Sequence, residues 1–131
     1  MEPVYSWGLL AWLAMSFLAI LNAGMRERFF KERMSELRAH QLSTVTLIAM
    51  ILAATKAFLV LLEPEATTGQ LFVLGVVWML LTLAFEFLMG HYAFGNSWRK
   101  LLADYDLARG RVWVLVPVAM LLAPWLIGSV L

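Results

Sequence analysis

The sequence predicts an all-α membrane protein that forms a four-helix transmembrane bundle, with amphipathic interfacial helices on its cytoplasmic side. Hydrophobic residues make up 63% of the 131 residues and charged residues only 15%, whereas a soluble domain of this size is about half apolar and a quarter charged. Polar segments divide the chain into four apolar stretches, each long enough to cross a bilayer. We therefore predict a single transmembrane domain over residues 1–131, with spans at about 5–24, 42–62, 70–92 and 112–130.

The composition also argues against several functions. The formal net charge is +1, so nothing indicates nucleic-acid binding. The chain has no cysteine, which removes disulfides, thiol nucleophiles and iron–sulfur ligation. Its two histidines, His40 and His91, are too few for a metal site without carboxylate help, so we predict no metal and no cofactor. Each is interpreted as an interfacial residue or, with a cavity beside it, as an axial ligand of haem or a pigment. We favour the first interpretation.

The first apolar stretch, residues 5–24, is predicted to be a retained helix and not a cleaved signal peptide. Its leading segment has no lysine or arginine, and its apolar run is too long for the core of a signal peptide. Asn22 and Arg26 are four residues apart, so they lie on one face near the end of this helix. The segment 25–41 has apolar residues at helical spacing between charged ones. It predicts an amphipathic helix at the headgroup level, the alternative being a solvated connector.

The second stretch, residues 42–62, begins with Ser43 and Thr44 and carries Lys56 towards its other end. A short acidic turn without any basic residue follows it. Lys56 is interpreted as a side chain that snorkels to the bilayer surface. The alternative is a site for an anionic ligand or a lipid headgroup near the outer leaflet.

The third stretch, residues 70–92, is apolar except for one carboxylate, Glu86. One helical face of this stretch holds Gly75, Met79, Thr82, Glu86 and Gly90. We predict that this face points into the bundle, because a carboxylate that faces lipid is costly. Glu86 is then either a carboxylate that carries a proton or neutralises a ligand, or a structural hydrogen-bond hub that fixes the helices. The structural interpretation is favoured.

The segment 93–111 is similar in kind to the earlier charged segment. Asn96 or Ser97 can cap a short helix there and Gly110 can end it, which again predicts an interfacial helix. The fourth span, residues 112–130, completes the chain.

The distribution of charge predicts the orientation. Nine of the ten basic residues lie in the segments 25–41 and 93–111. Positive charge is retained on the inner side of bacterial membranes, so both segments are predicted to be cytoplasmic and both termini periplasmic.

The two intramembrane charges are predicted to belong to different clusters. At a helical rise of about 1.5 Å per residue, Lys56 lies roughly 21 Å from the inner face and Glu86 roughly 9 Å, an offset of about 12 Å. A direct ion pair between them is therefore disfavoured. The predicted inner cluster consists of Glu86, Asn22, Arg26, Ser43, Thr44 and Arg111. The predicted outer-side polar site consists of Lys56, Glu63 and Glu65.

Five sequence pieces carry a resemblance that covers nearly the whole chain. They are LNAGMRERFF, HQLST, FEFLMGHY, SWRKLLADYDLARGRVW and LLAPW. Together they resemble a family of short four-helix bacterial inner-membrane proteins. The resemblance implies four helices and an inner-membrane location, and it carries no activity that can be transferred to a residue.

The leading functional hypothesis is a non-enzymatic subunit or accessory protein of a membrane complex, which packs against other membrane subunits or against itself and contacts membrane lipids. Small-residue packing faces and the lack of a complete reactive constellation favour it. The first alternative is a small oligomeric transporter or channel that uses Glu86 and Lys56. The second is a lipid- or quinone-modifying enzyme that uses Glu86, His91 and Asp104.

Overall fold

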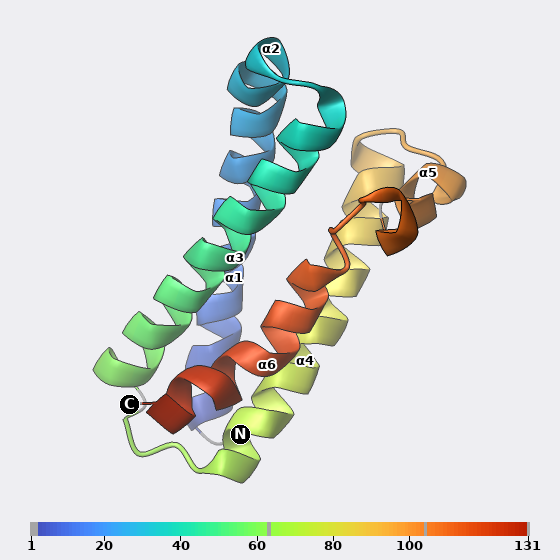
Figure 1. Cartoon of the computed structure of the whole chain (residues 1–131). Coiled ribbons are helices and arrows are strands. Elements are labelled where there is room, and N and C mark those ends of the chain that lie inside the picture. The colour runs from blue at the N-terminus through green and yellow to red at the C-terminus, as the bar shows by residue number, and fades with distance from the viewer. Residues whose placement is uncertain (1–2, 63, 104, 131) are drawn as a thin grey trace.

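The structure, a computed structural model, describes residues 3–62, 64–103 and 105–130. Every regular element in these residues is a helix, which confirms the all-α prediction. The long helices are α1 (Pro3–Met25), α3 (Glu36–Leu61), α4 (Thr68–Leu88) and α6 (Leu115–Val130) (Figure 1). With their extensions, α1, α3 and α4 are long and apolar enough to cross a membrane, while α6 is apolar but has only 16 residues.

The first charged segment does not form a helix of its own. The chain continues from α1 through a π turn, η1 (Arg26–Phe30), into α2 (Lys31–Arg33), and breaks at Met34, which is extended. Ser35 then caps α3, because its hydroxyl oxygen accepts a hydrogen bond from the backbone N–H of Arg38 at 3.2 Å. The interfacial helix expected over 25–41 is therefore divided between the extended ends of α1 and α3. Residues 25–33 contain no proline or glycine that would end the helix, so α1 continues through them, whereas Ser35 caps the start of α3.

The turn between α3 and α4 ends in a capping box. The side chain of Thr67 accepts from the N–H of Gln70 at 3.2 Å, and the side chain of Gln70 accepts from the N–H of Thr67 at 3.0 Å. This reciprocal pair satisfies two backbone donors at the start of α4. At its other end α4 continues as a second π turn, η2 (Met89–Ala93).

The second charged segment contains α5 (Trp98–Ala103) and a 3₁₀ turn, η3 (Leu107–Arg109). Ser97 caps α5 by accepting from the N–H of Lys100 at 3.1 Å. Gly110 ends η3 with φ 80°, a left-handed conformation that glycine adopts without the strain of a side chain. The short helix expected in this segment is thus present, although α6 begins three residues later than residue 112.

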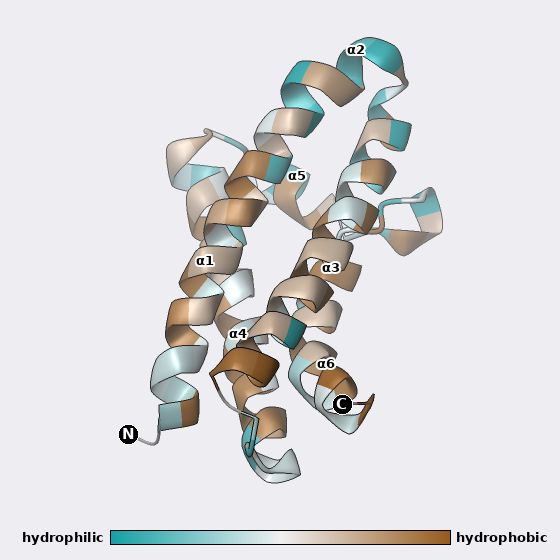
Figure 2. Ribbon diagram, turned by 90° about the vertical axis from the view of Figure 1, so that its left-hand side faces the viewer, coloured by the Kyte–Doolittle hydropathy of each residue, from teal (hydrophilic) through white to brown (hydrophobic). Residues whose placement is uncertain are grey.

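The long helices form two neighbouring pairs. Helix α1 packs on α3, while α6 packs on both α4 and α3 (Figure 1). The α3–α4 turn and both described ends of the chain lie at one end of the bundle, the turn end. Elements α2 and α5 lie at the opposite end, the charged end, where hydrophilic residues gather (Figure 2).

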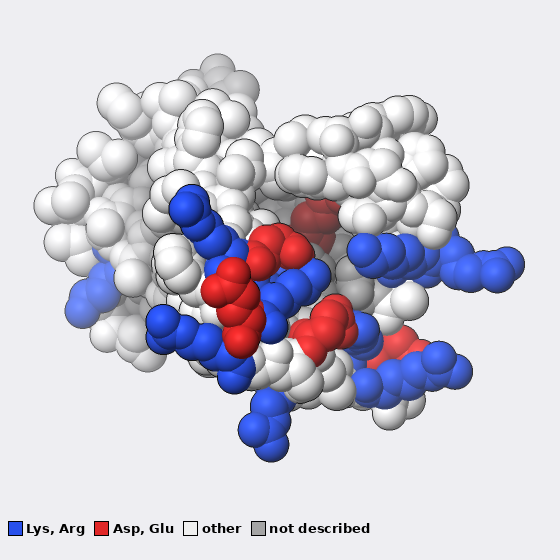
Figure 3. Space-filling view, turned by 90° about the horizontal axis from the view of Figure 1, so that it is seen from above, with Lys and Arg blue, Asp and Glu red and all other residues white. Residues whose placement is uncertain are grey.

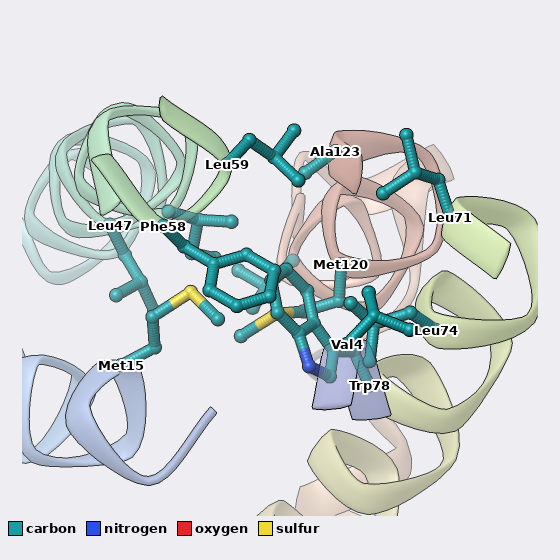
Figure 4. Packing of buried hydrophobic residues seen from close by; sticks show 12 residues of the cluster. Val4, Met15, Leu47, Phe58, Leu59, Leu71, Leu74, Trp78, Met120 and Ala123 are labelled. Atoms are coloured by element: carbon teal, nitrogen blue, oxygen red, sulfur yellow. The ribbon is translucent and has the colours of Figure 1, made fainter. Parts of the chain in front are cut away.

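The buried core packs side chains of α1, α3, α4 and α6 against one another (Figure 4). Most of its residues lie on the parts of these helices nearer the turn end. Trp78 at its centre is fully buried, and its indole N–H donates to the carbonyl oxygen of Gly8 at 2.9 Å. Gly75 brings α4 against α6 so closely that an added Cβ would lie 2.1 Å from the backbone oxygen of Leu121. Contact through a small residue of this kind is how membrane helices approach each other.

The outer surface of the bundle is apolar. Phe17 on α1, Leu61 on α3 and Phe72 on α4 are exposed by 67%, 76% and 56%. An apolar surface of this extent is too large for a soluble monomer. Together with the three long apolar helices, it indicates a multi-pass membrane protein.

Candidate functional site

A cavity of about 620 Å³ opens at the charged end. It lies between α1 with η1, the first turns of α3, the end of α4 with η2, α5, and the start of α6. Figure 3 looks onto this end and shows lysine and arginine side chains around a hollow, with acidic side chains among them and deeper inside. The cavity volume lies within the usual range for small-molecule pockets.

The cavity has apolar walls and a charged mouth. The main wall side chains are Trp12, Met15, Phe85, Trp113, Val116 and Met120. The charged lining side chains are Arg26, Glu27, Lys31, Glu36, Glu86 and Lys100. A mostly apolar lining with a few polar groups is typical of a site that binds an organic molecule.

At the end farthest from its charged mouth, the cavity is bordered by a contact between α1 and α4. The indole N–H of Trp12 donates to the hydroxyl oxygen of Thr82 at 3.0 Å. The ring of Trp12 also meets Phe85 edge to face, with ring centroids 5.8 Å apart. The buried core begins one helical turn further along α4, at Trp78.

Glu86 lines the cavity and is half-buried near the end of α4. The hydroxyl of Tyr105, which follows α5, donates a hydrogen bond to Oε2 of Glu86. Tyr105 also stacks on Phe87, with ring centroids 5.5 Å apart and an interplanar angle of 12°. The face of α4 expected to point inwards does so, since Gly75, Thr82 and Gly90 are buried.

Tyr105 was not among the predicted site residues. Its hydrogen bond to Glu86 crosses the loop between α4 and α6, and no helical spacing relates the two positions. The sequence offered one indication of this contact: Glu86 and Tyr105 were both expected near the inner surface of the membrane.

Arg26 lies on the opposite wall, in the π turn η1. Its guanidinium carbon is 5.6 Å from the ring centroid of Trp113, in the range of a cation–π contact. Its Nε lies 3.6 Å from Oε1 of Glu27, which also pairs with Lys31 at 2.9 Å. Arg26 and Glu86 therefore line the same cavity from different helices.

Asn22 and Ser43 join α1 to α3 beside the cavity. Both side chains are fully buried, and the hydroxyl of Ser43 donates to Oδ1 of Asn22. The Asn22 amide nitrogen is the one buried side-chain polar atom without a hydrogen-bond partner in the described residues. Thr44 is also buried, but its hydroxyl donates to the backbone oxygen of His40 in its own helix, at 2.8 Å. The structure thus brings together part of the predicted inner cluster.

Arg111 is held by the start of α3. Its guanidinium donates two hydrogen bonds to the carboxylate of Glu36, at 2.8 and 2.7 Å. The side chain of Gln41 donates to the carbonyl oxygen of Gly110 at 3.0 Å. Residues Glu36 and Gln41 were not predicted, because they lie 75 and 69 positions away from their partners in the chain.

The two histidines have different surroundings. Nε2 of His40, at the cavity, accepts from the backbone N–H of Val112 at 3.2 Å. His91 uses Nδ1 to bond the carbonyl oxygen of Asn96 at 2.9 Å, and its ring stacks on Trp98 with centroids 3.9 Å apart. Each histidine therefore has a ring nitrogen engaged by the backbone. Among the described residues, no group of three His, Cys, Asp or Glu side chains is placed to hold a metal ion.

The predicted outer-side site lies at the turn end, away from the cavity. Lys56 precedes the last residue of α3 by five positions, and both Lys56 and Glu65 are exposed. Glu63 lies outside the described residues, as does Asp104 of the enzyme hypothesis. Within the described part of the chain, no ion pair joins Lys56 to Glu65 or to Glu86.

The two π turns border the cavity from opposite sides. Arg26 and Glu27 belong to η1, and Met89 and Gly90 to η2, and all four line the cavity. A π turn widens a helix locally and is frequent at functional sites. The geometry here suits the binding of a molecule with an apolar body and a polar group.

Comparison of the chain with known protein families, with curated proteins and with solved structures finds no match. The resemblance to short bacterial inner-membrane proteins stays a prediction. The cavity is therefore the feature of the molecule that indicates a function.

Proposed function

We propose that the chain is a bacterial inner-membrane protein in which α1, α3, α4 and α6 all cross the bilayer. The charged end then faces the cytoplasm and the turn end the periplasm. The support is the positive-inside bias, since nine of the ten basic residues belong to the two charged segments. The 16 residues of α6 extend about 24 Å, somewhat less than a bilayer core of about 30 Å, a mismatch that local bilayer thinning and flanking residues accommodate.

Single-cysteine labelling tests this orientation, because the chain has no cysteine of its own. Glu65→Cys at the turn end should react with a membrane-impermeant maleimide added to spheroplasts. Ala108→Cys at the charged end should react only after the membrane is opened. The reverse pattern would contradict the orientation.

Within that membrane, the function we propose is non-enzymatic. The protein holds a small amphiphilic molecule in the cavity and acts as a subunit or accessory component of a membrane complex. The observation that carries the proposal is the cavity itself, about 620 Å³ with apolar walls and a charged mouth. The apolar outer faces of the helices provide the contact with lipids, with other subunits or with a second copy.

A cavity-filling substitution tests the binding function. Ala23 lines the cavity, so Ala23→Trp should fill part of it. Ala14, on the exposed face of the same helix, provides the matched control Ala14→Trp. We expect native mass spectrometry in a mild detergent to find a bound small molecule on the wild type and on Ala14→Trp, and much less on Ala23→Trp. A monodisperse monomer that carries no molecule and captures no subunit would contradict the proposal.

The second candidate function is a small oligomeric transporter. It is favoured by the access to the cavity, which opens at the charged end while the core fills the bundle towards the turn end. This is the arrangement of a transporter in a state open to one side. Glu86 lies on this path, whereas Lys56 does not. Proteoliposome uptake that Glu86→Gln abolishes would favour this candidate over simple binding.

A further inference from the structure

The proposed binding function leaves the chemistry of the ligand open, and the next step rests on that function. We propose that the cavity takes an amphiphilic anion, whose headgroup binds at the charged mouth while its hydrocarbon body lies against the apolar walls. Three bases line the cavity, Arg26 from η1, Lys31 from α2 and Lys100 from α5. They belong to segments on different sides of the hollow (Figure 3), so a headgroup at the mouth meets positive charge from more than one side.

Two of these bases share one acid. Oε1 of Glu27 lies 3.6 Å from Nε of Arg26, and Oε2 lies 2.9 Å from Nζ of Lys31. The guanidinium of Arg26 also lies over the ring of Trp113, which orients it without neutralising it. Arginine carries five N–H donors in a planar fork that suits phosphate and carboxylate groups. This pair of bases therefore keeps positive charge and donors for an anion.

The rest of the charged end adds to this excess. Nζ of Lys100 donates to Oδ1 of Asn96 at 3.1 Å, an acceptor without charge. Glu36 also lines the cavity, but its two carboxylate oxygens accept from the guanidinium of Arg111. In the sequence, the segments 25–41 and 93–111 hold nine bases and five acids. Such a surplus attracts anionic headgroups to the end of a membrane helix.

The interior of the cavity suits the hydrocarbon body and not the headgroup. Glu86 lies there, one helical turn along α4 from Thr82, and accepts a hydrogen bond from Tyr105. A carboxyl group at this place offers an anion no positive charge. The methionines Met15 and Met120 line the same space, and flexible thioether side chains adapt to apolar ligands of different shape. The headgroup is therefore expected at the mouth.

The cavity also reaches the apolar outer face of the bundle. Trp12 joins α1 to α4 through its bond to Thr82. Two turns further along α1, Ile20 lines the cavity and is 43% exposed, and the neighbouring turn carries the exposed Phe17. The wall of the cavity and the outer face of α1 thus meet at Ile20. An amphiphile that enters here keeps its headgroup at the bilayer surface while its hydrocarbon body passes between α1 and α4.

Two phospholipids with the same acyl chains test the charge of the headgroup. The protein in dodecylmaltoside is mixed with equal amounts of dioleoylphosphatidylglycerol, an anion, and dioleoylphosphatidylcholine, which has no net charge. Native mass spectrometry counts the lipids that remain bound. We expect the wild type to retain phosphatidylglycerol in preference to phosphatidylcholine. The cavity variant, Arg26→Gln with Lys100→Gln, should lower this preference about tenfold or more.

The matched control removes two positive charges from the same end of the bundle. Arg28 and Arg99 are exposed and do not line the cavity, so Arg28→Gln with Arg99→Gln is the surface variant. It should prefer phosphatidylglycerol like the wild type. Lys100→Gln alone should lower the preference about fivefold, and Arg99→Gln alone should not change it. Thermal unfolding establishes that each variant is folded, and the single changes carry the test if Arg26→Gln is not.

A third probe distinguishes the two sources of such an anion. Hexadecyl phosphate carries a phosphate on a single chain. If it displaces phosphatidylglycerol from the wild type, the ligand is a free single-chain anion. If phosphatidylglycerol stays bound in its presence, the ligand is a lipid of the bilayer. Both results support an amphiphilic anion at the mouth, provided that the cavity variant weakens the binding and the surface variant does not.

The outcomes separate this inference from the binding function. If the wild type retains phosphatidylcholine as readily as the two anions, or if the cavity and surface variants lower the preference equally, the mouth does not select an anion. The binding function still stands in that case if Ala23→Trp, which fills the cavity, lowers the amount of bound lipid. If the wild type retains none of the three probes and Ala23→Trp changes nothing, both proposals fail.

Discussion

The two ends of the bundle are built from the same helices and packed in opposite ways. At the turn end, a Cβ added to Gly75 would lie 2.1 Å from the backbone of α6. At the charged end, a Cβ added to Gly24 would meet nothing within 4 Å, and one added to Gly90 would meet a side chain and not backbone, Cδ2 of Leu101 at 2.6 Å. The contact between Trp12 and Thr82 lies at the boundary between the two regimes.

This difference shows how a few packed helices can make a cavity at one end of a bundle. The tight end fixes the helices through backbone contact and a fully buried Trp78. The open end keeps α1 and α4 apart and gives the space to aromatic walls and Glu86. A rigid support of this kind keeps a binding site preorganised.

The largest expected effect is at the tightest contact. Gly75→Ala should lower the free energy of unfolding by about 3 kcal/mol, because the new methyl group meets backbone that cannot move aside without separating α4 from α6. Gly24→Ala is the matched change at the open end. It should be neutral or raise the free energy of unfolding by roughly 0.5–1 kcal/mol, since alanine favours the helix. Thermal unfolding in detergent measures both, and equal effects of the two changes would remove the contrast between the ends.

The next effect compares two tryptophans that each bridge α1 and α4. Trp78→Phe removes a buried hydrogen bond and leaves a void in the core, which should cost about 2 kcal/mol. Trp12→Phe removes a similar bond beside the cavity, where there is already space, and should cost about 1 kcal/mol or less. Both variants are followed by the same unfolding assay. A larger loss for Trp12→Phe would show that the boundary contact, and not the core, holds the helices together.

The sequence predicted the part of this architecture that depends on local hydropathy. The spans expected at 5–24 and 70–92 fall within the observed helices, and the span expected at 42–62 ends one residue past α3, because a run of apolar residues is a property of one segment. The position of Glu86 on a face with Gly75 and Thr82 also followed from helical periodicity alone.

The cavity was beyond such prediction, because it depends on the distance between helices. Ala19 and Ala23 were expected to mark a close helix contact, yet both line the cavity, whereas Gly75 lies against the backbone of α6. The partners of Glu86 and Arg111 were also missed, since Tyr105 and Glu36 reach them across loops. The division of residues 25–41 between two helices depended on one cap, Ser35, whose effect on the chain direction is not visible in hydropathy.

A smaller effect is expected from the polar contact between α1 and α3. A double-mutant cycle with Asn22→Ala and Ser43→Ala should give a coupling energy of about 0.6 kcal/mol, the usual value for hydrogen bonds between membrane helices. The unsatisfied amide nitrogen of Asn22 lowers the cost of Asn22→Ala alone, because its burial costs energy in the wild type, but this term cancels in the cycle. A coupling energy above about 2 kcal/mol would show that this hydrogen bond holds α1 on α3 more strongly than is usual between membrane helices.

The smallest effect is expected at the rim of the open end, where Arg111 makes a bidentate contact with Glu36. The side chains are 27% and 55% exposed, so water and salt screen the pair. A double-mutant cycle with Glu36→Gln and Arg111→Gln should give a coupling energy of about 0.5 kcal/mol at low salt, and less at 0.5 M salt. The pair Lys31–Glu27, also on the rim, is the control and should respond to salt in the same way. A coupling energy that stays constant with salt would mean that the Arg111–Glu36 contact is shielded from water. The charged end would then be packed more tightly than its contrast with the turn end suggests.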